Sequence, residues 1–206
     1  MLCLRLSPRK DFTLRGPLTH SQCDEVKQDV ADMFEECDIH TWPIDCFEIA
    51  RKLHYVLRPY SSLPQEEMVD AYNEDPDGFS KVEMNPETEM YQYVIYYNDA
   101  TGNEGRIRWT IFHEIGHIYR GHHDNPDDSN SEIEEAEADL FAKYAIAPPP
   151  LIRYLKITRP EEIQDTFCTS LEASFNIMDY FWKRVQYGPR NMESFEIQII
   201  RLFQVA

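Results

Sequence analysis

The spacing of apolar residues along the chain predicts helices toward both ends. In residues 21–37, and again in a segment that begins at Pro43, apolar side chains recur at the period of an amphipathic helix. The same period predicts a pair of short helices at 159–167 and 170–185 and a final helix at about 192–204. Helices are therefore expected on both sides of the central part of the chain.

The central part begins with a different pattern. Residues 60–90 are polar and contain several prolines, which predicts a short helix and loops. The run Tyr91–Tyr97 is rich in β-branched and aromatic residues, and turn-forming residues follow it at 98–102. This pattern predicts a strand that ends in a turn.

A buried helix is predicted after this turn, between Asn103, a residue type that caps helices, and Gly121. Apolar residues lie on both sides of the face that carries His113, Glu114 and His117, so the helix should be buried on most sides. Unpaired polar groups are costly to bury. The predicted burial of these three side chains therefore favours a functional role for them over a chance occurrence.

A second central helix is predicted after a polar loop at residues 124–130. It opens with a capping box formed by Ser131 and Glu134 and runs to Ala147. Three consecutive prolines from Pro148 onward end it, because proline cannot continue a helix.

The composition indicates a folded, acidic protein. The chain has 206 residues, of which 42% are hydrophobic, and this is enough for one sizeable core. A net charge of −17 repels phosphate backbones and anionic lipid headgroups, so we expect no direct binding to nucleic acid or membranes. The five cysteines contain no Cys-x-x-Cys pair, and neither a signal peptide nor a membrane span stands out. We therefore expect a cytoplasmic protein with reduced thiols.

The pentapeptide at residues 113–117, His-Glu-Ile-Gly-His, carries the chemistry of the chain. On a helix, His113 and His117 lie about 40° apart around the axis, so both rings project from one face and can bind one Zn²⁺. Glu114 is turned about 60° from His117. Its carboxylate can therefore reach over the metal and take a proton from a metal-bound water. This pattern is the signature of zinc metalloproteases.

A catalytic zinc site uses three protein ligands and keeps a fourth position open. Residues 124–139 include eight acidic residues and no lysine or arginine, and most of these acids are expected on a solvated face. Glu135, which lies 18 residues after His117, is the best candidate for the third ligand, and Glu137 is an alternative. Asp139 shares a helix face with Glu135 and can accept a hydrogen bond from the far nitrogen of a ligand histidine.

Two further histidines, His122 and His123, follow the central helix directly. A histidine at the C-terminus of a helix usually complements the helix dipole. We therefore expect this role for both residues, with a contribution to catalysis as the weaker alternative.

Three segments between Tyr93 and Pro148 carry a family resemblance: Ile95–Asn98, Arg106–His122 and Glu135–Ala142. Together they resemble the ImmA/IrrE family of metallopeptidases. The family's pattern Glu-x-Glu/Gln-Ala-Asn/Asp-x-Phe-Ala matches the third segment, and its first glutamate is the steadier position. The resemblance therefore favours Glu135 over Glu137 as the metal ligand.

The resemblance implies an α+β fold with a zincin-like core. This core would contain a small twisted sheet, the active-site helix and a second helix that delivers the carboxylate ligand. Tyr91–Tyr97 would be the edge strand of the sheet, able to pair with an extended substrate. We expect residues 1–150 to form this metallopeptidase domain and residues 151–206 to form a helical extension packed on it.

The predicted function is that of a zinc-dependent endopeptidase with one Zn²⁺ per chain. His113, His117 and Glu135 would bind the metal, and Glu114 would be the catalytic base. The family implies a specific protein substrate, a helix-turn-helix repressor of a phage, a mobile element or a stress response. The oligomeric state stays open.

The alternative is a DNA-binding or protein-binding regulator that uses the protease fold without turnover. The helices predicted at 159–167 and 170–185 have the outline of a helix-turn-helix. Acidic residues outnumber basic ones there, whereas a recognition helix needs the opposite. The intact Glu114 also opposes this alternative, because a purely structural zinc site needs no base.

Overall fold

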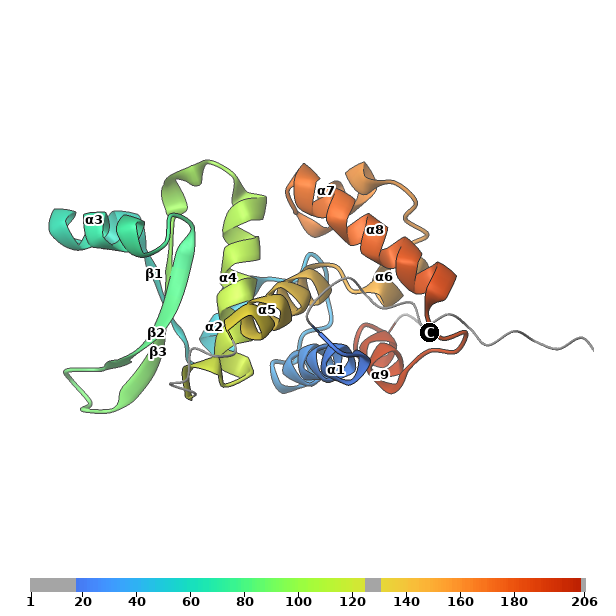
Figure 1. Ribbon diagram of the computed structural model, residues 1–206, viewed down its shortest axis with the longest axis horizontal. Coiled ribbons are helices and arrows are strands. Elements are labelled where there is room, and N and C mark those ends of the chain that lie inside the picture. The colour runs from blue at the N-terminus through green and yellow to red at the C-terminus, as the bar shows by residue number, and fades with distance from the viewer. Residues whose placement is uncertain (1–17, 125–130, 205–206) are drawn as a thin grey trace, which may run out of the picture.

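The structure is a computed structural model, and it describes residues 18–124 and 131–204 (Figure 1). A small sheet and helix α3 form one end of the molecule, and α7 and α8 lie at the other end. Helices α4 and α5 lie between them. The elements, in chain order, are α1 (His20–Glu36), α2 (Cys46–Lys52), β1 (Val56–Pro59), η1 (Tyr60–Ser62), α3 (Gln65–Glu74), β2 (Gly78–Met84), β3 (Tyr91–Tyr97), η2 (Asp99–Thr101), α4 (Glu104–Tyr119), η3 (His122–Asp124), α5 (Ser131–Ile146), α6 (Pro149–Tyr154), α7 (Pro160–Phe167), α8 (Leu171–Tyr187) and α9 (Ser194–Leu202).

Among the described residues, the sheet has three strands in the order β1-β3-β2. β1 is parallel to β3, with Val56 opposite Val94. β2 is antiparallel to β3, and its register runs from Gly78 opposite Tyr97 to Met84 opposite Tyr91. The predicted α+β fold is confirmed, and the sheet is small, as a zincin-like core requires.

The strand predicted at Tyr91–Tyr97 is confirmed in its extent, but its predicted place at the edge of the sheet is wrong. This strand, β3, is the central one, and β2 lies at the edge. The sequence prediction missed β2 because residues 60–90 as a whole are polar and contain prolines, which predicts helix and loops, although Lys81 and Glu83 alternate with Val82 and Met84. β1 was not predicted because it has only four residues, too few to show a clear strand pattern.

The two faces of the sheet border two separate clusters of buried side chains. On one face, Ile95 belongs to the main core together with Ile111 and Ile115 of α4. On the other face, Val94 and Tyr96 belong to a smaller cluster with Tyr60 and Ala71, under α3. This alternation follows from the two-residue period of a strand.

Helix α4 begins after Asn103, as predicted. The Asn103 side chain accepts a hydrogen bond from the backbone N–H of Arg106 at 3.1 Å. α5 packs closely against α4 because Gly116, inside the pentapeptide, has no side chain. A Cβ at this position would lie 3.0 Å from Cβ of Phe141. Any larger residue at 116 would therefore push the two helices apart.

One predicted helix boundary needs correction, and one short helix was not predicted. α2 begins at Cys46 rather than at Pro43, because the side chain of Asp45 caps it by accepting from the N–H groups of Phe47 and Glu48. The prolines at 148–150 do end α5, but they also begin a further short helix, α6, which the sequence prediction missed. Proline is well suited to the first turn of a helix, where its missing N–H has no partner to lose.

The C-terminal helices share the main core with the rest of the chain. Buried residues of α6, α8 and α9, such as Leu151, Ile177 and Ile199, belong to the same cluster as Val30 of α1 and Phe112 of α4. The predicted division at residue 150 stays a prediction. Most of the loop predicted at 124–130 lies outside the described residues. Among those that are described, no helix is both long and apolar enough to cross a membrane.

Candidate active site

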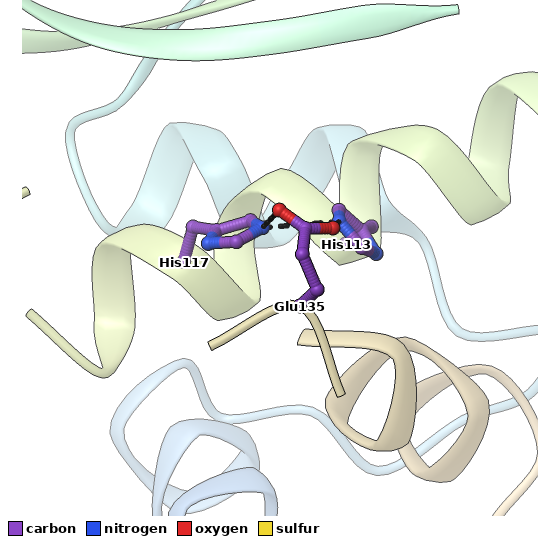
Figure 2. A group of neighbouring side chains, drawn as sticks. All are labelled: His113, His117 and Glu135. Atoms are coloured by element: carbon purple, nitrogen blue, oxygen red, sulfur yellow. Dashed lines mark hydrogen bonds and ion pairs between the residues drawn. The ribbon is translucent and has the colours of Figure 1, made fainter. Parts of the chain in front are cut away.

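The structure brings together the side chains of His113, His117 and Glu135 (Figure 2). The Nε2 atoms of the two histidines on α4 lie 3.0 Å apart. Glu135 comes from α5, and its carboxylate oxygens lie 3.3 Å from Nε2 of His113 and 3.4 Å from Nε2 of His117. One ligand atom from each residue therefore lies within 4.8 Å of the other two.

This group has the donor set and the access of a catalytic zinc site. Two imidazole nitrogens and one carboxylate are typical zinc ligands, and three protein ligands leave a position for water or substrate. The histidine side chains are only 17% and 13% exposed, whereas that of Glu135 is 63% exposed. The site is thus enclosed by protein on the histidine side and open to solvent on the Glu135 side.

The Nε2 atoms of His113 and His117 lie 3.0 Å apart, and this contact is favourable only if a proton or a cation lies between the two nitrogens. Burial, together with the neighbouring histidines, lowers the pKa of His117 to about 3, so its ring is neutral and can bind a metal. Burial alone would also lower the pKa of His113, but Asp139, Glu114 and Glu135 raise it above its usual value. The residues present therefore fit a divalent cation.

The far nitrogen of each histidine also has a partner. Nδ1 of His113 lies 3.2 Å from Oδ1 of Asp139, as the sequence predicted, and this contact lowers the pKa of Asp139. Nδ1 of His117 lies 2.9 Å from Nδ1 of His122, in the short helix η3. Each ring is thus held in place by a group outside the candidate metal site.

Glu137, the alternative third ligand, lies outside the group. Its Oε2 is 2.8 Å from Nε of Arg120 and 3.0 Å from Nε2 of His122, and its side chain is only 8% exposed. Arg120 also pairs with Asp29 of α1. Because α5 turns its residues by about 100° each, Glu135 and Glu137 point in different directions, and Glu135 alone of the two faces the histidines.

Glu114 is buried, with 7% of its surface exposed, and its Oε2 accepts a hydrogen bond of 2.6 Å from Oγ of Ser80. Ser80 belongs to the edge strand β2, and its hydroxyl also lies 2.9 Å from Nε2 of His123. Burial raises the pKa of Glu114 to about 7, although the bond from Ser80 opposes this shift. A carboxylate in this range can take up and release a proton near neutral pH.

The sequence analysis missed the contributions of Ser80, His122 and His123. Ser80 lies in a strand that was not predicted, so nothing in the local pattern pointed to it. The two histidines were visible just after the pentapeptide, but they were expected to serve the helix dipole. Instead, His122 contacts His117 and His123 contacts Ser80, because the chain turns back after α4.

A separate hollow of about 610 Å³ lies between α3 and the sheet. Its lining includes Arg58, Lys81 and Tyr96 but none of the three candidate metal ligands. Ser80 is the point where this hollow approaches the site. The candidate metal ligands therefore lie outside this hollow, which is a distinct feature.

A comparison with family models matches residues 65–183 to the IrrE N-terminal-like domain of the peptidase M78 family. The match covers more than half of the chain and includes α4 and α5, which supply the three candidate metal ligands and Glu114, and β2, which supplies Ser80. A comparison with curated proteins found no match. The chain therefore belongs to the peptidase M78 family, the IrrE N-terminal-like metallopeptidases, as its resemblance to ImmA/IrrE proteins predicted.

Proposed function

We propose that this protein is a zinc-dependent endopeptidase that cuts a specific protein partner. The observation that carries the proposal is the convergence of His113, His117 and Glu135 beside the buried carboxylate of Glu114. A metal site with a base next to it is the arrangement that hydrolysis needs, whereas a purely structural site would be closed by a fourth protein ligand.

We assign one Zn²⁺ per chain to His113, His117 and Glu135. When bound there, zinc supplies a Lewis acid that polarises the scissile carbonyl and lowers the pKa of the attacking water. The protein's part is to hold neutral ring nitrogens and one carboxylate in place, and the pKa of about 3 of His117 keeps its ring neutral across the physiological range.

Glu114 is the proposed general base. Its carboxylate takes the proton from the attacking water and then returns it to the leaving amine of the cut peptide bond. The hydrogen bond from Ser80 orients this carboxylate, and its burial brings its pKa to about 7, so that both transfers are possible near neutral pH. The water, the carbonyl and Glu114 must be aligned for this sequence, which explains the need for a rigid buried base.

The edge strand β2 is the proposed docking surface for the substrate. Its inner edge pairs with β3, and within the described part of the chain no strand pairs with its outer edge. An extended segment could add to this edge through main-chain hydrogen bonds. Because Ser80 of β2 contacts Glu114, a segment bound along the strand would pass the catalytic groups.

The proposed substrate is a helix-turn-helix repressor in the cytoplasm, as the family resemblance implies. The net charge of −17 favours a basic extended segment, such as a linker in a DNA-binding protein, and disfavours direct contact with DNA or membranes. The specific repressor can be sought among the products of neighbouring genes.

Co-expression with such a repressor tests the proposal. Wild-type protein should cut the repressor, and Glu114→Gln should leave it intact while still binding zinc. Tight, salt-sensitive binding of the purified protein to duplex DNA, without cleavage of any co-encoded repressor, would instead support the regulator alternative.

A further inference from the structure

We propose that His122 and Glu137 form a positioning pair for His117 and fix the tautomer in which Nε2 of His117 is free to bind a metal. This inference deepens the proposed function, since it rests on His117 being a metal ligand. It assigns a role to two residues that do not themselves belong to the candidate ligand group.

An unbroken line of contacts runs from helix α1 to the ring of His117. Asp29 pairs with Arg120, Nε of Arg120 lies 2.8 Å from Oε2 of Glu137, and the same oxygen lies 3.0 Å from Nε2 of His122. The last link is the 2.9 Å contact between Nδ1 of His122 and Nδ1 of His117. The side chains of Glu137 and His122 are 8% and 9% exposed, so water competes little for these bonds.

The backbone after α4 makes this line possible. Gly121 adopts a φ of +73°, a conformation that glycine reaches at little cost, and the chain reverses there into η3. The reversal brings His122 back against His117, five residues earlier in the sequence. A residue at position 122 of a continued helix would project elsewhere.

The direction of each hydrogen bond follows from the carboxylate at the end of the line. Glu137 can only accept, so Nε2 of His122 carries a proton. In a neutral ring, Nδ1 of His122 is then bare and accepts from Nδ1–H of His117. His117, with its proton on Nδ1, has its lone pair on Nε2, the atom that faces His113 and Glu135.

The last hydrogen bond of the line decides which nitrogen of His117 is free. If Nδ1 of His122 carried a proton, Nδ1 of His117 would have to accept it, and the proton of His117 would move to Nε2. The ring could then no longer offer Nε2 to a metal.

The tautomers can be measured directly in the wild-type protein by ¹H–¹⁵N correlation spectra of the histidine side chains, both with and without zinc. We expect protons on Nδ1 of His117 and on Nε2 of His122 in both forms. A proton on Nδ1 of His122 would overturn the proposal. This measurement needs no variant, and in the metal-free form it does not depend on zinc binding.

Zinc affinity in variants tests the function of the pair. His122→Phe keeps a ring but removes both nitrogens, and we expect zinc to bind about 10- to 100-fold more weakly. His122→Gln can accept from His117 and donate to Glu137, so it should recover most of the affinity. His40→Phe is the matched control, because His40 is an exposed histidine between α1 and α2.

The outcomes separate this inference from the proposed function. If wild type binds zinc and His122→Phe binds it equally well, the positioning role is wrong and the metal site stands. If wild type binds no zinc, the proposed function fails, and the spectra of the metal-free protein still decide the tautomers. Circular dichroism and thermal unfolding of each metal-free variant show whether a loss of affinity reflects unfolding.

Discussion

Helix α5 supplies both an exposed and a buried side of the candidate metal site. Glu135 and Asp139, one turn apart, have side chains that are 63% and 60% exposed, whereas the side chain of Glu137 between them is 8% exposed. The two exposed carboxylates contact ring nitrogens of His113 and His117 directly. Glu137 contacts His117 only indirectly, through His122, and is itself paired with Arg120.

The difference shows how one acidic helix can serve two purposes. A carboxylate exposed to water is ionised at little cost, and it is accessible to a metal and a substrate. A buried carboxylate must be paired, and once paired with Arg120 it holds the surrounding groups in one arrangement. The exposed side of α5 is thus suited to ligand chemistry, and its buried side is suited to support.

Removal of both ring ligands should have the largest effect on the candidate metal site. In a His113→Ala/His117→Ala variant we expect zinc content to fall from about one ion per chain to none, because a single carboxylate does not hold the metal. Elemental analysis of purified protein measures this. Zinc that survives the double substitution would place the metal site elsewhere in the chain.

Glu114→Gln should separate metal binding from chemistry. The amide keeps the size of the side chain and cannot take the proton from water, so activity should fall by about 10²- to 10⁴-fold while zinc content is unchanged. Cleavage of a co-expressed repressor and elemental analysis report the two quantities. A variant as active as wild type would refute Glu114 as the base.

A pair of alanine substitutions on α5 compares the two sides directly. Glu137→Ala leaves Arg120 and His122 without their shared partner in a buried position, and it should lower the free energy of unfolding by about 3–5 kcal/mol. Glu135→Ala, on the exposed side, should change it by less than about 0.5 kcal/mol in metal-free protein. Urea titration of both variants measures the difference. Equal losses would show that burial does not divide the helix as described.

The smallest effect is expected at Asp139. Asp139→Asn keeps a hydrogen-bond acceptor for Nδ1 of His113 but removes its charge, so zinc affinity should fall by about 10-fold with little change in stability. Competition with a chromophoric chelator measures the affinity. An unchanged affinity would mean that the orientation of His113 depends on the surrounding packing and not on this exposed contact.

Most parts of the site that were predicted from the sequence lie within single elements, and the exceptions are Glu135 and the contact of Asp139 with His113, which join α5 to α4. The period of apolar residues located α4, and the cap at Asn103 located its start. The spacing of His113 and His117 places both rings on one face of any helix, whatever the rest of the fold does. The choice of Glu135 over Glu137 rested on its spacing from His117 and on the helix face that it shares with Asp139, and the family resemblance favoured it independently.

The tertiary structure decided the contacts between distant segments. The order of the strands made β2 the edge and β3 the centre, and the contact between Ser80 and Glu114 joins residues 34 positions apart. The turn at Gly121 brought His122 back to His117, and the packing of α5 on α4 buried Glu137 against Arg120. Local patterns record which face of an element is apolar, but pairing between elements depends on how those faces fit together. That fit is a property of the whole core, to which segments across most of the described chain contribute.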